Sequence, residues 1–131
     1  ANLSVKIQGE LRYHSMHANT WIIHLGSATE ESIERLQRSL NKAMPYALGL
    51  YEASAYEKDL IKDGVFGGEE TLKKEWLAQV EKIIGQTQLT LPDVLALTPR
   101  YGGRVGEHTE HLQPLLDEMS EVFRIDPTAE W

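Results

Sequence analysis

The chain has 131 residues, a formal net charge of −7 and no cysteine. Its length suits one domain, and its 41% of hydrophobic residues are enough for a core. The acidic balance argues against nucleic-acid binding, which needs clustered Lys and Arg, and against an anionic membrane surface. The lack of cysteine excludes disulfides, thiolate zinc sites and cysteine nucleophiles, and it fits a cytoplasmic location. No apolar run approaches the roughly 20 residues that span a bilayer.

The first predicted element is a long helix that ends at Gly26. Its apolar face repeats every three or four residues, and consists of Leu3, Ile7, Leu11, His14, Ala18, Ile22 and Leu25. We name this face the seam, and its spacing predicts a helix packed in a bundle. The chain has no initiator Met and opens inside this helix, so we expect a fragment or a processed product.

A second helix is predicted directly after the turn. Ser27 is its expected N-cap, with Glu30 at the third helical position of a capping box. Its apolar face consists of Ile33, Leu36, Leu40, Met44, Ala47 and Tyr51. Pro45 lies within this pattern and should kink the helix or end its regular part. Because the turn is short, the two helices should form an antiparallel hairpin.

The rest of the chain predicts two more helices separated by irregular segments. Residues 52–68 indicate a loop, and a helix then follows with Leu72, Trp76, Val80 and Ile83 on one face, closed by Gly85. Residues 86–106 are rich in Pro and Gly and predict an extended connector with short helical turns at most. The last helix carries Leu112, Leu115, Met119 and Val122, and Asp126-Pro127 stops it.

No stretch shows the alternating pattern of a strand, so the predicted fold class is all-α. We expect about four helices in a single helical domain over residues 1–131.

One stripe of the first helix carries residues suited to metal binding: Glu10, His14, His17, Trp21 and His24. In di-iron bundles, inward Glu and Glu-x-x-His groups on facing helices supply the ligands. Here Leu11 stands three residues before His14, where the motif has its carboxylate. Two interpretations remain open. Glu10 and His14 either contribute to a metal site, or His14 is a histidine at the edge of the core with a carboxylate partner, which we favour.

A second candidate precedes the last helix, where Glu107, His108, Glu110 and His111 lie within five positions. Imidazole and carboxylate suit zinc, iron or manganese, but further ligands would have to come from facing helices. The alternative is a polar cluster that secures the helix start, where carboxylates are favoured by the exposed amides. Pro114 also indicates that a helix begins near here. We favour this structural role.

Several stretches together resemble a known family. They are "ELRYH", "TWIIHLGSATEES", "LQRSLNKAMPY", "GGRVGEHTEHLQPLLDEM" and the final Trp131. They are similar to the non-catalytic, ferritin-like subunit of bacterial phenylacetyl-CoA 1,2-epoxidase, a multicomponent oxygenase of phenylacetate degradation. The resemblance covers essentially the whole chain, more loosely over residues 52–90. The family subunit is longer, and this chain resembles its C-terminal half.

The resemblance implies a ferritin-like helical bundle and a supporting role. In that complex a paralogous catalytic subunit holds two irons and epoxidises the ring of phenylacetyl-CoA with O₂. Set against the ligands of that paralogue, Leu11 stands at the Glu position and His14 at the His position, so one ligand is lost. We therefore expect no catalytic residue and no metal or cofactor on this chain, with di-iron in the catalytic partner. Glu10, His14, His108, Glu110 and His111 remain as vestigial or alternative candidates.

Three functions are consistent with these features. The leading one is a scaffold subunit of the epoxidase, which binds the catalytic paralogue and forms a homo-oligomer in isolation. The second is a metal-dependent oxygenase of the ferritin-like di-iron class in its own right. The third is a stand-alone helical homodimer.

Overall fold

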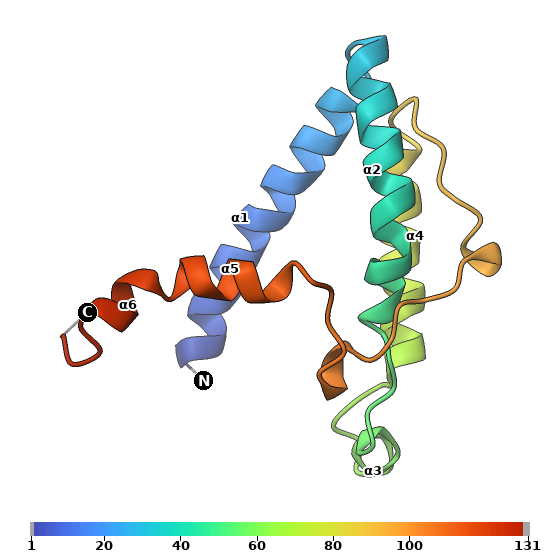
Figure 1. Ribbon diagram of the computed structural model, residues 1–131. Coiled ribbons are helices and arrows are strands. Elements are labelled where there is room, and N and C mark those ends of the chain that lie inside the picture. The colour runs from blue at the N-terminus through green and yellow to red at the C-terminus, as the bar shows by residue number, and fades with distance from the viewer. Residues whose placement is uncertain (1, 130–131) are drawn as a thin grey trace. The chain divides into compact units, whose positions relative to one another are not determined.

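The computed structural model describes residues 2–129 (Figure 1). Trp131, which is part of the resemblance, lies outside this range. The described chain contains α1 (Asn2–Leu25), α2 (Glu30–Gly49), α3 (Glu57–Lys62), α4 (Glu69–Ile84), η1 (Val94–Ala96), η2 (Gly103–Val105), α5 (Leu112–Met119) and α6 (Glu121–Ile125). No strand occurs in residues 2–129, so the all-α prediction is confirmed, in keeping with a ferritin-like helical class.

The described residues form more than the expected four or so helices, because α3 was not foreseen and the predicted last helix is divided into α5 and α6. The chain divides into two units, residues 1–100 and residues 101–131, and each is described by itself. The organisation as a single domain stays a prediction. Among the residues described, no helix is both long and apolar enough to cross a membrane.

The turn between α1 and α2 shows where the first helix ends and how the second begins. Gly26 closes α1 as predicted, and its amide donates to the Ile22 carbonyl at 2.8 Å. The N-cap of α2 is Thr29 and not Ser27, so that prediction was wrong. The Ser27 amide still donates to the His24 carbonyl at 3.3 Å, which keeps Ser27 in the closing turn of α1. Thr29 has the extended backbone of an N-cap, with φ −117° and ψ 156°.

α2 continues through Pro45 and ends four residues later, at Gly49, so Pro45 does not end the helix. Proline removes one helical hydrogen bond and disfavours a helix interior by about 3 kcal/mol. Met44 and Leu48, on either side of it, are only 2% and 1% exposed. Full burial of such side chains contributes about 1.5–3 kcal/mol each, which is enough to hold the helix through the proline.

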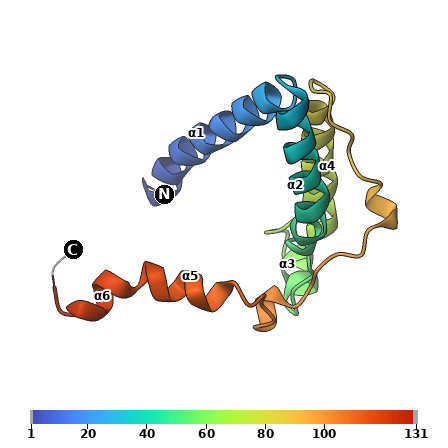
Figure 2. The ribbon, with the colours of Figure 1, turned by 45° about the horizontal axis from the view of Figure 1, so that its top comes forward.

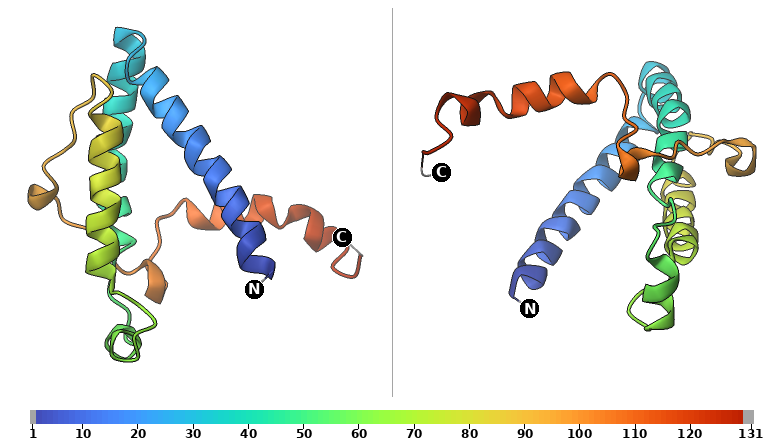
Figure 3. Two further views of the ribbon diagram at one scale, coloured as in Figure 1. Left: turned by 180° about the vertical axis from the view of Figure 1, so that it is seen from behind. Right: turned by 60° about the horizontal axis from the view of Figure 1, so that its bottom comes forward.

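The core of the first unit lies where α2 and α4 run side by side (Figure 3, left). Its buried apolar residues, among those described, are Met44 and Leu48 of α2, Ile84 of α4 and Leu89 of the following connector. The rings of Tyr51 and Trp76 also meet there, with centroids 5.4 Å apart. α4 ends at Gly85, as the sequence predicts.

The structure corrects the loop predicted over residues 52–68, because this segment contains α3. This helix has only six residues, too few to show an amphipathic repeat. It is tied to the next helix by Glu57, whose carboxylate accepts a hydrogen bond from the Glu69 amide at 2.9 Å. Glu57 thereby caps the start of α4, where the preceding Gly68 has φ +91° and no side chain of its own.

The connector after α4 is extended and includes η1, as predicted. It returns alongside α2 and is held there by backbone and side-chain hydrogen bonds (Figure 1). The Gln88 amide donates to the Gly26 carbonyl, and the Arg100 amide donates to the Pro45 carbonyl, both at 2.9 Å.

In the second unit, the predicted last helix is divided into α5 and α6 at Ser120. The Ser120 hydroxyl donates to the Leu116 carbonyl at 2.6 Å. A serine hydroxyl bound in this way competes with regular helical hydrogen bonding. Asp117 and Arg124 bridge it with an ion pair of 2.9 Å. The helical segment stops before Asp126, as predicted.

The predicted antiparallel hairpin of α1 and α2 is only partly present. The two helices meet at a short turn, but they diverge from it (Figure 2). Close packing is therefore confined to the end of α1 nearest the turn, where Ile22 and Ile23 are half-buried.

Candidate functional site

The most distinctive surface of the first unit is the seam of α1, which was predicted to be packed and is instead largely exposed. Leu3, Ile7 and Leu11 are 70%, 46% and 60% exposed. The prediction of a covered face is thus wrong over most of this helix within the structure described. The reason lies in the diverging geometry of α1, which leaves α2 and α4 beyond reach of the first turns.

Aromatic and imidazole rings follow one another along the flank of the same helix. Tyr13 stacks on His17 with ring centroids 6.1 Å apart and an interplanar angle of 24°. His17 in turn meets Trp21 edge-on at 6.2 Å. We name Tyr13, His17 and Trp21 the ladder. Residues three or four apart on a helix are neighbours, so the ladder follows from the spacing of these three residues in the sequence. All three side chains are exposed, which leaves the ladder open to a partner.

Glu10 and His14 lie on this exposed helix and have no third donor beside them. Within residues 2–129, no group of three or more His, Asp or Glu residues is placed to hold a metal ion. The ring nearest to His14 is Tyr13, at 6.0 Å and edge-on. His14 is also not the predicted core-edge histidine, because it is exposed rather than packed. The described residues therefore do not fit a di-iron centre.

His108, Glu110 and His111 lie in the second unit, in the turn before α5, and all three are exposed. His111 is the N-cap of α5, yet its side chain makes no capping hydrogen bond. Its backbone is already helical, with φ −78° and ψ −17°. A residue whose side chain accepts a hydrogen bond from the first amides of a helix normally has an extended backbone. The prediction that the His111 side chain secures the start of this helix is therefore wrong, and a structural role of Glu107, His108 and Glu110 stays a prediction. Backbone bonds begin the helix instead, including Leu115 amide to His111 carbonyl at 3.3 Å.

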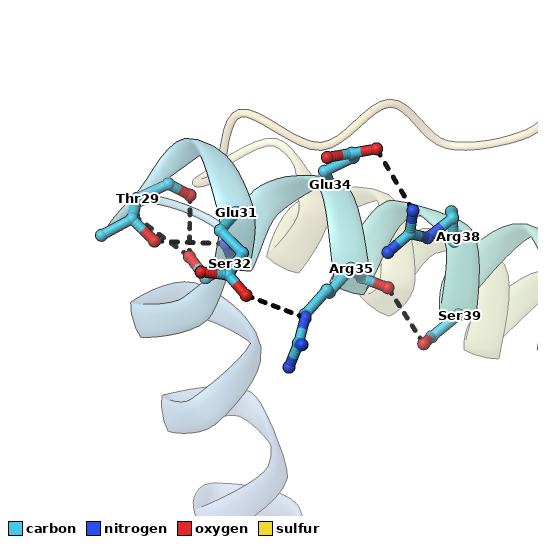
Figure 4. A network of polar contacts seen from close by, with 7 residues as sticks. All are labelled: Thr29, Glu31, Ser32, Glu34, Arg35, Arg38 and Ser39. Atoms are coloured by element: carbon cyan, nitrogen blue, oxygen red, sulfur yellow. Dashed lines mark hydrogen bonds and ion pairs between the residues drawn. The ribbon is translucent and has the colours of Figure 1, made fainter.

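A polar network that we did not foresee surrounds the start of α2 (Figure 4). Thr29 and Ser32 form a reciprocal capping box with hydrogen bonds of 3.2 and 3.1 Å. Glu31 pairs with Arg35 at 3.2 Å, on side chains that are more than two-thirds exposed. Exposed pairs of this kind contribute little to stability. A serine at the third helical position, where a capping box normally has Glu or Gln, obscured this motif in the sequence.

An open hollow adjoins this network at the elbow of α1 and α2. It is lined by Leu25, Thr29, Glu31, Ser32, Arg35, Leu36 and Ser39. Its hydroxyls are already engaged: Ser32 donates to the Leu25 carbonyl at 2.7 Å, and Ser39 donates to the Arg35 carbonyl at 3.0 Å. Leu25 and Leu36 supply its apolar surface. This hollow suits an apolar side chain from a partner better than a polar small molecule.

Tyr51, a half-buried residue of the first unit, has a pKa that its surroundings perturb. Burial raises the pKa of Tyr51 above its ordinary value, and the nearby Glu69 carboxylate raises it further. The phenol consequently stays protonated near neutral pH, which fits a packing partner of Trp76 and not a general base.

Comparison with known proteins agrees with the resemblance drawn from the sequence. The profile of a family described as "Phenylacetic acid catabolic protein" matches residues 1–131. The chain is also similar to one of the subunits of 1,2-phenylacetyl-CoA epoxidase from Escherichia coli (strain K12), with 34% identity over 131 residues. This match covers 100% of the chain and 52% of the relative, so the chain spans about half the length of that protein.

Proposed function

Because the chain belongs to the family of phenylacetic acid catabolic proteins, we propose that it serves phenylacetate catabolism as a scaffold subunit of an epoxidase complex. The similarity to an epoxidase subunit, at 34% identity over the whole chain, is the observation that carries this proposal. A subunit of such a complex acts through the chains that it binds. Its expected partner is a paralogous catalytic subunit that holds the two irons. We further propose a cytoplasmic location, which suits a chain without cysteine.

We assign no catalytic residue to this chain and no metal or cofactor. Leu11 stands where a bridging or terminal carboxylate of a di-iron motif would be needed, and a leucine offers no donor atom. Glu10 and His14 are on α1, and His108, Glu110 and His111 belong to the other unit. An oxygenase in its own right would need a metal ligand in place of Leu11.

The exposed seam of α1 also favours self-association of the isolated chain. Large exposed apolar patches are rare on monomers and usually mark interfaces. We propose that the isolated chain forms a homo-oligomer, and that its partner in the complex is the catalytic paralogue.

Co-expression tests the scaffold proposal directly. The catalytic subunit of a phenylacetyl-CoA epoxidase would carry an affinity tag and would be produced with and without this chain. Each preparation would then be supplied with reductase, O₂ and phenylacetyl-CoA. We expect the chain to co-purify with the tagged subunit and to raise epoxide formation over the subunit alone. The proposal would be wrong if the chain neither co-purified nor changed the rate. A chain that epoxidised phenylacetyl-CoA without the catalytic subunit would instead support the oxygenase alternative.

A further inference from the structure

We draw no further inference here: the strongest candidate, the exposed apolar seam along α1, carries none because nothing in the structure shows what covers it.

Discussion

Gln37 and Thr90, 53 residues apart in the sequence, exchange two hydrogen bonds of 2.8 Å each. The Gln37 amide nitrogen donates to the Thr90 carbonyl, and the Thr90 amide donates to the Gln37 side-chain oxygen. A side-chain amide here pairs with a peptide group in the way that one strand pairs with another. The pairing holds the connector after α4 against the middle of α2.

Replacing Gln37 by alanine should loosen this connector. Each lost hydrogen bond contributes about 0.5–1.5 kcal/mol, so we expect the free energy of unfolding to fall by about 1–3 kcal/mol. Gln79→Ala, at an exposed position of α4, is the matched control and should change it by less than about 0.5 kcal/mol. Urea unfolding monitored by circular dichroism measures both. Equal effects of the two changes would contradict the structural role of Gln37.

Gly49 should tolerate no side chain. A Cβ at this position would collide with the backbone carbonyl of Arg100, which passes directly over the end of α2. Gly49→Ala should therefore destabilise the chain by about 1–3 kcal/mol. Gly9→Ala has open space around its Cβ and lies within α1, so it should stabilise the helix by about 0.5–1 kcal/mol. The melting temperatures of the two variants should shift in opposite directions. Shifts in the same direction would argue against the close approach of the Arg100 carbonyl to Gly49.

His111 should contribute little to stability despite its place at the start of α5. Its side chain is exposed and makes no capping hydrogen bond, so His111→Ala should change the free energy of unfolding by less than about 0.5 kcal/mol. Ser32→Ala removes one half of the capping box of α2 and should cost about 1 kcal/mol. Urea unfolding measures the free energy of unfolding of both variants. A larger loss for His111→Ala than for Ser32→Ala would restore the structural role first expected of this histidine.

The second unit should become less stable as the pH falls. Hydrogen bonds from Arg124 and then from Gln113 hold the pKa of Asp117 below its ordinary value. The pKa of this carboxyl is lowered in the folded chain. Its contribution to the free energy of unfolding is therefore present above its ordinary pKa, and is lost as the pH falls from about 4 through the lowered pKa. Carboxyl NMR titration should place the pKa of Asp117 below the ordinary value of an aspartate. Arg124→Gln should move the pKa of Asp117 upward, and an unchanged value would show that the ion pair has no effect.

Reconstitution with ferrous iron tests the absence of a di-iron site. The purified chain should retain sub-stoichiometric iron by elemental analysis, because Leu11 offers no carboxylate and the candidate ligands are not gathered among the described residues. His14→Ala should leave this low iron content unchanged. Two tightly held irons per chain, lost on that substitution, would revive the oxygenase alternative. Leu11→Glu would then be expected to raise the iron content further.

The sequence by itself determined the elements whose cause is local. α1, α2 and α4 carry long repeats of apolar residues, and Gly26 and Gly85 directly follow the ends of α1 and α4. The stop at Asp126 is equally local. The family was also accessible, because short stretches such as "GEHTEHL" carry it without any three-dimensional information.

Only the tertiary structure decided the features that depend on distant contacts. Pro45 stays inside α2 because Met44 and Leu48 are buried beside it, and α3 is too short to be seen without its link from Glu57 to Glu69. The spacing of the seam of α1 predicts a packed face. Periodicity, however, identifies an apolar surface and does not show what covers it. Whether that surface meets α2 or water depends on the angle at which α1 leaves its turn. The turn itself is tied to a segment far away in the chain, because the Gln88 amide donates a hydrogen bond to the Gly26 carbonyl.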